Sequence, residues 1–221
     1  LGEEKSRVYF SGCPGMDILK NSKKKIKKNF FDNFNFTGAK FDFKKNFLLV
    51  VNHPVSTENK KANLEKINIL FKTLNNIKMH KIMFWPNSDA YSDVISSQMR
   101  TFKENHQKND YTFIINSSPE EYATLLYNAS CLVGNSSSFI REGSQMGVPA
   151  VLLGTRQLKR EVGKNVIYTN YNLKNITAKI NFQIKKSRYK PQNIYGKGNA
   201  GKFIVKALEK LKPSIKKQIT Y

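Results

Sequence analysis

A cluster of small polar residues, Gly134-Asn135-Ser136-Ser137-Ser138, joins an apolar strand-like segment to a predicted helix. Backbone N–H groups, serine hydroxyls and the positive end of a helix dipole would meet there, and such a point suits a phosphate group. A serine that only caps the helix would give the same pattern, so the pentapeptide alone leaves both interpretations open. This segment has no P-loop lysine and no G-x-G-x-x-G motif, which disfavours an ATPase or a dinucleotide enzyme.

Three further side chains could carry chemistry. Glu142 is expected about one turn inside the same helix, where its carboxylate could accept hydrogen bonds from ribose hydroxyls, or could simply pair with Arg141 on the surface. Arg156 follows the next apolar run and could bind a phosphate through its guanidinium group, or could be a solvated loop residue. His53 ends another apolar run, so its imidazole could donate to a leaving phosphate oxygen, transfer a proton, or be structural.

The elements that must position these residues repeat at intervals of about thirty residues. Each unit is a short apolar run, a polar turn and a helical pattern. Residues 20–43 are expected to form a helix and a loop with inward-packed rings, and Ser118-Pro119-Glu120-Glu121 is typical of a helix start. The expected strands are 8–11, 47–52, 81–85, 112–115, 131–133, 150–153 and 166–168. The expected helices are 62–74, 92–104, one after Ser118, one from Ser138 to Met146, 174–182 and 202–211.

This alternation predicts an α/β fold, a Rossmann-like parallel sheet with helices on both faces. In such sheets ligands bind beyond the carboxyl ends of the strands. The predicted strand ends carry His53, then Asn87 with Asp89, then 135–138, and then Arg156. The sequence therefore predicts a single site at this edge of the sheet.

The composition limits the class of protein. Lys+Arg number 38 and Asp+Glu 16, a net charge of +22, so phosphate, nucleic acid and anionic membranes are candidate partners. The hydrophobic fraction of 39% is low, but 12% aromatic residues argue against a disordered chain. Nucleic acid is not expected, because the aromatic residues of 30–45 resemble core residues rather than a stacking platform.

Other features bear on location and completeness. No apolar run approaches the roughly 20 residues of a membrane helix. Cys13 and Cys131 are too few for a disulfide framework or a zinc site, so we expect a reduced, cytoplasmic protein that holds no metal. The chain begins at Leu1, not at an initiator Met, which suggests a domain of a longer protein.

Several motifs follow one another along the chain. They are Gly12-Cys13-Pro14-Gly15-Met16-Asp17, His53-Pro54-Val55-Ser56-Thr57-Glu58, Trp85-Pro86-Asn87-Ser88-Asp89-Ala90, Gly134-Asn135-Ser136-Ser137-Ser138, Arg141-Glu142, Gly154-Thr155-Arg156-Gln157, Arg160-Glu161 and Tyr195-Gly196-Lys197-Gly198-Asn199-Ala200. In this order they resemble the UDP-N-acetylglucosamine 2-epimerase family over about residues 8–210. The resemblance implies that residues 1–221 are the UDP-binding, carboxyl-terminal half of a two-domain fold similar to that of B-type glycosyltransferases.

The resemblance also implies residue roles. Ser136 and Ser137 would hold the UDP diphosphate and Glu142 the ribose hydroxyls, while other motif residues would line the diphosphate and the sugar. The full set expected to bind the UDP-sugar is Asn87, Asp89, Ser136, Ser137, Glu142 and Arg156, with His53 as the catalytic residue. No cofactor is expected.

The family reaction eliminates UDP across carbons 1 and 2 of the sugar, and the resulting glycal is reprotonated on the other face of carbon 2 while a nucleophile adds at carbon 1. The acid and base carboxylates come largely from the amino-terminal half. The resemblance therefore implies that this chain alone is inactive and that its own amino-terminal domain is a partner. Assembly as a homo-oligomer stays open.

The His53 motif distinguishes two branches of the family. The non-hydrolysing branch reads His-Arg-Arg-Glu-Asn, whereas His53-Pro54-Val55-Ser56-Thr57-Glu58 resembles the hydrolysing branch, which releases UDP and N-acetylmannosamine, a sialic acid precursor. Tyr91 replaces a usual glycine, Phe139 a small residue and Lys197 an acidic one. The two bulky replacements leave a diacetamido-trideoxy UDP-sugar as a second candidate substrate. The nucleotide-sugar domain of a glycosyltransferase would share the diphosphate site, and the net charge of +22 is also compatible with a basic nucleic-acid-binding module.

Overall fold

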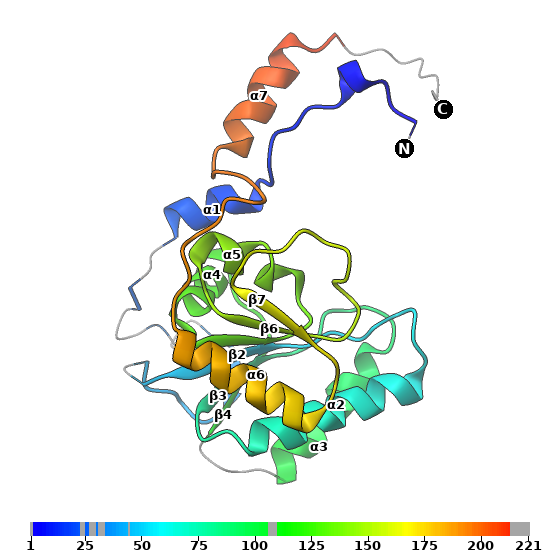
Figure 1. The fold of residues 1–221 in the computed structure, drawn as a ribbon, viewed down its shortest axis with the longest axis vertical. Helices are drawn as coiled ribbons and strands as arrows, with labels where there is room; N and C mark the ends of the chain where they lie inside the picture. Colours follow the sequence, from blue (N-terminus) through cyan, green and yellow to red (C-terminus); the bar gives the residue numbers. More distant parts are fainter. Residues whose placement is uncertain are drawn as a thin grey trace. The chain divides into compact units, whose positions relative to one another are not determined.

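The computed structural model describes residues 2–22, 25–26, 30, 34–43, 45–105 and 110–212. The chain forms two compact units, one of Ser22–Ile194 and a smaller one of Leu1–Asn21 with Tyr195–Tyr221 (Figure 1). The larger unit contains the whole sheet and all the residues predicted to bind a ligand.

The larger unit is built on a seven-stranded sheet with the order β1-β4-β3-β2-β5-β6-β7. All neighbouring strands are parallel except β1, which pairs antiparallel with β4. The strands are β1 (Phe36–Gly38), β2 (Phe47–Val51), β3 (His80–Phe84), β4 (Tyr111–Ile114), β5 (Cys131–Gly134), β6 (Ala150–Leu153) and β7 (Val166–Thr169). The six parallel strands confirm the sequence prediction.

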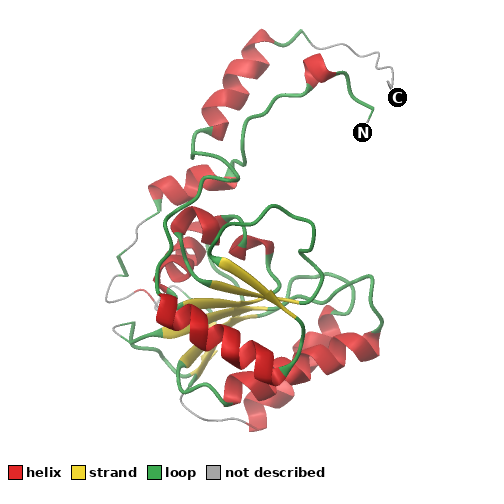
Figure 2. Ribbon diagram, viewed as in Figure 1, coloured by secondary structure: helices red, strands yellow, loops and turns green. Residues whose placement is uncertain are grey.

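Helices cover both faces of the sheet (Figures 1 and 2). On one face, α2 (Lys60–Asn75), α3 (Ser92–Asn105) and α6 (Leu173–Lys186) contribute to a single buried cluster with residues of β2 to β6. On the other face lie α4 (Pro119–Asn128) and the short α5 (Glu142–Met146). The predicted α/β class with helices on both faces is confirmed.

Local sequence explains why these elements form. Every residue of β2 is buried, as expected for an apolar strand covered on both sides. Ile67, Leu70 and Leu74 place one apolar stripe of α2 in the core, and Phe71 stacks on Phe102 of α3 with ring centroids 4.2 Å apart. The predicted helix start at Ser118 is confirmed as a complete capping box.

The edge strand β1 was not predicted from the sequence. It has only three residues, and it ends at Gly38, whose φ of +91° and close approach to Tyr111 exclude a side chain: a Cβ there would lie 2.5 Å from the Tyr111 carbonyl oxygen. The described rings around it do pack inward, with Phe34 and Phe41 buried. Residues 23–24, 27–29, 31–33 and 44 lie outside the described part of this segment.

The smaller unit contains the 3-10 helix η1 (Lys5–Arg7), α1 (Gly15–Asn21) and α7 (Ala200–Lys210). The Asp17 carboxylate accepts hydrogen bonds from the first N–H groups of α7, those of Ala200 at 3.0 Å and Gly201 at 2.8 Å. Two of the sequence motifs thereby meet, although they stand at opposite ends of the chain.

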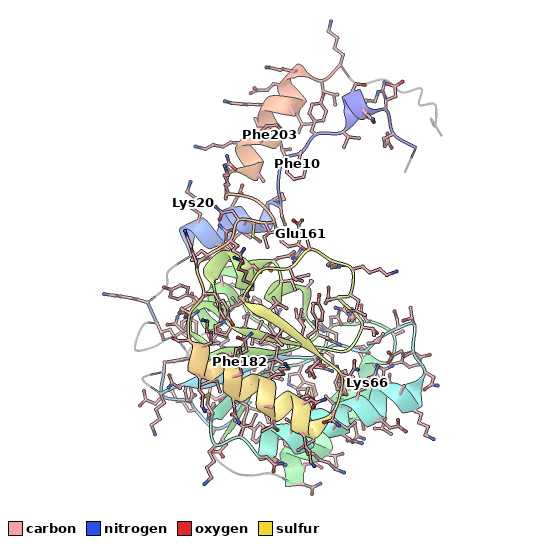
Figure 3. The ribbon with its side chains drawn as sticks, viewed as in Figure 1. Phe10, Lys20, Lys66, Glu161, Phe182 and Phe203 are labelled. Atoms are coloured by element: carbon pink, nitrogen blue, oxygen red, sulfur yellow. The ribbon has the colours of Figure 1, made fainter. Side chains whose placement is uncertain are left out.

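The predicted strand at 8–11 is wrong. Val8 and Phe10 are 64% and 93% exposed, and within the described residues of this unit no other strand is available to pair with them. The side chain of Phe10 is labelled in Figure 3, as is Phe203 of α7, which is also exposed. None of the described helices is long and apolar enough to cross a membrane.

Candidate functional site

The strand order places a topological switch point between β2 and β5. From β2 the chain continues to β3 and β4 on one side, then returns to build β5, β6 and β7 on the other. Ligands of open parallel sheets bind at such a point, beyond the carboxyl ends of the strands. Here the segment after β2 begins with Asn52 and His53, and the segment after β5 begins with Asn135.

His53 and Asn135 are hydrogen-bonded across this switch point. The His53 N–H donates to Asn135 Oδ1 at 2.7 Å, and Asn135 Nδ2 donates to the His53 carbonyl at 2.8 Å. Gly134 makes this approach possible: its φ is +138°, and a Cβ there would lie 2.0 Å from the Val51 carbonyl oxygen. The two segments were predicted to lie close together, and their direct hydrogen bonds confirm this.

The imidazole of His53 is largely buried and neutral at physiological pH. Burial, together with the nearby Arg156 guanidinium, lowers its pKa from the usual 6.5 to about 4, while Asp89 acts in the opposite direction. Nδ1 accepts the Asn87 backbone N–H at 3.3 Å, so the ring proton is on Nε2. The side chain is thus a hydrogen-bond donor with no charge.

Arg156, after β6, connects the same group of residues. Its guanidinium donates to Asp89 Oδ2 at 3.2 Å and to the Asn135 carbonyl at 3.4 Å. Both side chains of the ion pair are partly exposed, so a ligand can reach them. A hollow of about 380 Å³ adjoins the pair; its lining residues are Val55, Ser56, Thr57, Asp89, Ala90, Thr155 and Arg156.

The serine cluster adopts a shorter helix than expected. After Ser136 come the 3-10 helix η3 (Ser137–Phe139) and the five-residue α5, whose C-cap is Gly147 with φ of +65°. The predicted helix end at Met146 is confirmed, but the helix begins at Glu142 and not directly after Ser138, so the helix dipole is weaker at the serines. The break falls where Phe139 and Ile140 are buried completely.

The serine hydroxyls are not equivalent. Ser136 Oγ accepts the Ser138 N–H at 3.3 Å and lies 2.8 Å from Ser138 Oγ, which lies 2.6 Å from the Tyr122 hydroxyl. Ser136 therefore acts as the cap of η3, the structural role that the sequence pattern also allowed. The half-buried Ser137 has no side-chain partner among the described residues, so its hydroxyl is available to a ligand.

Glu142 is the first residue of α5, not a residue one turn inside a helix. Arg141 donates to its Oε1 at 3.3 Å, whereas Oε2 is buried and has no hydrogen-bond partner in the described structure. Burial raises the pKa of this carboxyl group and Arg141 opposes the effect. An unpaired buried carboxylate oxygen costs free energy unless a donor reaches it, and a ligand hydroxyl is such a donor.

The loop after β2 is held on its other side by α2. The motif glutamate, Glu58, pairs through both oxygens with Lys66 of α2, labelled in Figure 3. Lys66 Nζ also lies 5.5 Å from the ring centroid of Tyr171, whose hydroxyl donates to Asn52 Oδ1 at 2.7 Å. The polar residues of the motif therefore also support the loop structurally.

Sequence reasoning missed several residues of this network. Asn63 is one of them, although it stands four residues before Ile67 on the apolar stripe of α2, and a polar residue on such a stripe is a usable signal. Gln157, next to Arg156, donates to the Asn135 carbonyl at 3.0 Å. Tyr122 carries no local signal, because its contact with Ser138 joins two different elements.

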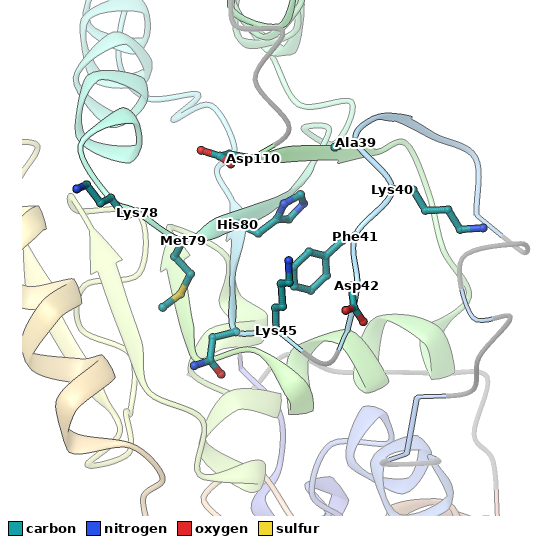
Figure 4. Close-up of a pocket in the computed structure, with 10 residues that line it drawn as sticks. Ala39, Lys40, Phe41, Asp42, Lys45, Lys78, Met79, His80 and Asp110 are labelled. Carbon is teal, nitrogen blue, oxygen red and sulfur yellow. The ribbon is translucent and has the colours of Figure 1, made fainter.

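A second hollow, of about 880 Å³, lies at the opposite, amino-terminal edge of the strands (Figure 4). It is lined by Phe41 and His80, whose rings stack 4.3 Å apart, and by Lys40, Lys45, Lys78, Asp42 and Asp110 among others. None of the predicted site residues lines it. The described residues contain no group of three or more His, Cys, Asp or Glu placed to hold a metal ion.

Comparison with known sequences identifies relatives over nearly the whole chain. The family model described as UDP-N-acetylglucosamine 2-epimerase matches residues 1–209. The UDP-N-acetylglucosamine 2-epimerase of Neisseria meningitidis is 27% identical over 205 residues, which are 90% of this chain and 50% of that protein. The UDP-N,N'-diacetylbacillosamine 2-epimerase (hydrolyzing) of Legionella pneumophila is 26% identical, with 90% and 50% covered. The chain thus spans about half the length of these curated relatives.

Solved structures show the same fold. The UDP-GlcNAc 2-epimerase of Methanocaldococcus jannaschii, in complex with UDP-GlcNAc and UDP, superposes with a TM-score of 0.68 at 19% identity, covering 94% of this chain and 56% of that one. The ADP-heptose heptosyltransferase II of Escherichia coli gives 0.50 at 8% identity, covering 73% and 53%. The predicted likeness to one half of a B-type glycosyltransferase fold is confirmed.

Proposed function

The chain belongs to the UDP-N-acetylglucosamine 2-epimerase family, and we propose that it binds the UDP part of a UDP-sugar at the carboxyl edge of its sheet. One observation carries this proposal: His53, Asn87, Asp89 and Arg156, from three separate motifs, are joined by hydrogen bonds at the β2–β5 switch point. We further assign the chain to the carboxyl-terminal half of the enzyme.

Each candidate residue has a group suited to UDP. The Arg156 guanidinium provides a positive charge and a fork of N–H donors for the diphosphate, and Ser137 adds a hydroxyl that has no other side-chain partner among the described residues. Glu142 Oε2, buried and unpaired in the described structure, is suited to accept from a ribose hydroxyl. Ser136 contributes mainly by holding the turn in which Ser137 stands.

We propose that this site stabilises the leaving group, UDP, during the elimination. In the elimination, a base removes the proton on carbon 2, the C–H electrons form the carbon 1–carbon 2 double bond, and the carbon 1–oxygen electrons leave with UDP. The departing oxygen gains negative charge, which the Nε2–H donor of His53 and the Arg156 guanidinium stabilise. No pair of free carboxylates stands beside His53 in the described structure, since Asp89 is paired with Arg156. We propose that this half alone does not turn over substrate.

We propose the hydrolytic outcome, in which water adds to carbon 1 of the glycal and carbon 2 is reprotonated on the other face. The motif at 53–58 and the similarity to the hydrolysing enzyme of Legionella pneumophila support it. The full-length protein in deuterium oxide should release UDP and a free 2-epimerised amino sugar with one solvent deuteron at carbon 2. A UDP-linked epimer as the main product, without free sugar, would contradict this outcome, and a glycosylated acceptor would favour a transferase.

Calorimetry with the 221-residue chain tests the binding proposal. We expect a Kd for UDP of about tens of micromolar to millimolar, because half of a cleft leaves the sugar unheld. Ser137→Ala should weaken binding about tenfold or more, the value of one hydrogen bond to a charged group. Ser130→Ala is the matched control, because Ser130 is a half-buried serine just before the amino end of β5, whereas Ser137 lies beyond its carboxyl end. An unchanged affinity in Ser137→Ala would remove Ser137 from the site.

A further inference from the structure

Two buried asparagines clamp the turn that carries His53. Asn135 binds both backbone polar groups of His53, as described above. Asn63, on the first turn of α2, binds Val55 in the same way: the Val55 N–H donates to Asn63 Oδ1 at 2.8 Å, and Asn63 Nδ2 donates to the Val55 carbonyl at 3.1 Å. A carboxamide has one acceptor and one donor side, so each asparagine matches the N–H and C=O of one residue.

Because both asparagines are buried, their hydrogen bonds to the turn are costly to lose. Asn135 is 1% and Asn63 is 2% exposed, so neither side chain can replace a lost protein hydrogen bond with water. Both are anchored independently: the Asn135 carbonyl accepts from Gln157, and Asn63 Nδ2 also donates to the Asn59 carbonyl at 3.1 Å. The two clamps therefore fix the turn from two different elements, the end of β5 and the start of α2.

Between the clamped residues stands Pro54, whose ring fixes its own φ near −65°. With His53 and Val55 held on either side, the backbone direction of the turn is determined, and with it the direction of the His53 side chain. The 3.3 Å contact between His53 Nδ1 and the Asn87 N–H depends on that direction. A small rotation of the turn would break this contact and release the proton from Nε2 to either ring nitrogen.

We propose that Asn135 and Asn63 are positioning residues, which hold the His53-Pro54-Val55 turn so that His53 keeps Nδ1 against Asn87 and its proton on Nε2. The use made of that proton, donation to the leaving diphosphate, rests on the proposed function. The clamp itself does not depend on that function, because all its contacts are made between residues of this chain. Neither asparagine needs to touch the substrate.

Nuclear magnetic resonance of the ligand-free 221-residue chain, labelled with ¹⁵N in the histidine rings, tests the proposal. The chain has three histidines, and His53→Gln assigns the signal of His53. The wild type should show one neutral tautomer at pH 7, with the proton on Nε2. Asn135→Ala and Asn63→Ala should each give a mixture of tautomers. The His53 titration midpoint should also rise from about 4 toward 6.5, by one pH unit or more, with Arg156 and Asp89 still the charged groups that face the ring.

Asn165→Ala is the matched control for loss of a buried carboxamide. Asn165 is 1% exposed, accepts from Ser144 Oγ at 2.8 Å and donates to the Val148 carbonyl at 2.7 Å, and in the described part of the chain it forms no hydrogen bond with His53. It should destabilise the fold to a similar extent and leave the His53 spectrum as in the wild type. An unchanged His53 spectrum in both clamp variants, or the same change in Asn165→Ala, would overturn the proposal.

Alternative variants and a second measurement allow the result to be interpreted even if one variant fails to fold. If Asn135→Ala does not fold, Asn135→Asp preserves the shape and the acceptor but turns an oxygen toward the His53 carbonyl, and Asn63→Ala tests the other clamp alone. UDP affinity is measured on the same samples. A wild type that binds no UDP, with the tautomer change intact in the variants, would refute the proposed function and leave the clamp standing; the reverse pattern would refute the clamp alone.

Discussion

Acidification should weaken the folded state through His53. Its pKa is about 4 in the folded chain against 6.5 when unfolded, because burial and Arg156 disfavour the imidazolium. Between these values the unfolded chain binds the proton and the folded chain does not. Unfolding is therefore favoured progressively as the pH falls from 6.5 toward 4, and the stability associated with neutral His53 is fully present only above 6.5.

The magnitude follows from the width of that window. Each pH unit is worth about 1.36 kcal/mol, so lowering the pH from 6.5 to 5 should cost about 2 kcal/mol from this residue, or about 1 kcal/mol if partial exposure screens the effect. Other groups also titrate, so the quantity of interest is a difference between two proteins. His53→Gln keeps an acceptor for the Asn87 N–H and removes the titration.

Urea unfolding, followed by circular dichroism at pH 7.5, 6.5, 5.5 and about 5, measures that difference. The wild type should lose about 1–2 kcal/mol of unfolding free energy relative to His53→Gln over this range, with nearly all of the loss below pH 6.5. Parallel pH profiles for the two proteins would refute the buried, neutral state of His53. A wild type that gains stability on acidification, relative to the variant, would indicate a charged His53 paired with Asp89.

Two further predictions concern Glu142 and Tyr91. Glu142→Gln should reduce the preference for UDP over pyrophosphate, because an amide accepts less well than a carboxylate from ribose hydroxyls; calorimetry with both ligands checks this, and an equal loss for both would make Glu142 structural. Tyr91→Gly should raise the unfolding free energy by about 1 kcal/mol, because Tyr91 has φ of +69° and glycine adopts that conformation without a steric cost. Ser187→Gly, at φ of +61°, is the comparison for Tyr91→Gly in the same urea assay, and a destabilised Tyr91→Gly would mean that its ring packs productively.

The parallel core of the fold was predictable because its elements carry local signals. Strand β2 is a continuous apolar run, and α4 begins with a capping box that needs only four residues to recognise. The wrong predictions fall where pairing with another strand, and not the local sequence, determines whether a strand forms. The run at 8–11 has the composition of a strand but no described strand beside it, and β1 depends on how closely Gly38 approaches its neighbour.

The candidate site also has features that the sequence predicts and features that it does not. The convergence of His53, Asn87 and Arg156 could be predicted, because parallel strands end at one edge. Their electrostatics could not, since the low pKa of His53 depends on burial and on Arg156, which is distant in sequence. The roles of Asn63 and Asn135 depend on hydrogen-bond geometry that no motif encodes.

A backbone ¹H–¹⁵N titration of the 221-residue chain with UDP tests the central claim most directly, because it reports which edge of the sheet binds. We expect shifts that saturate with UDP and cluster at His53, Asn87, 135–138, Glu142 and Arg156, with little change at Lys45, Lys78, His80 or Asp110 around the opposite hollow. Shifts concentrated at that opposite hollow, or no shifts at UDP concentrations of about 10 mM, which correspond to less than about 3 kcal/mol of binding free energy, would contradict the assignment of a UDP site to this chain.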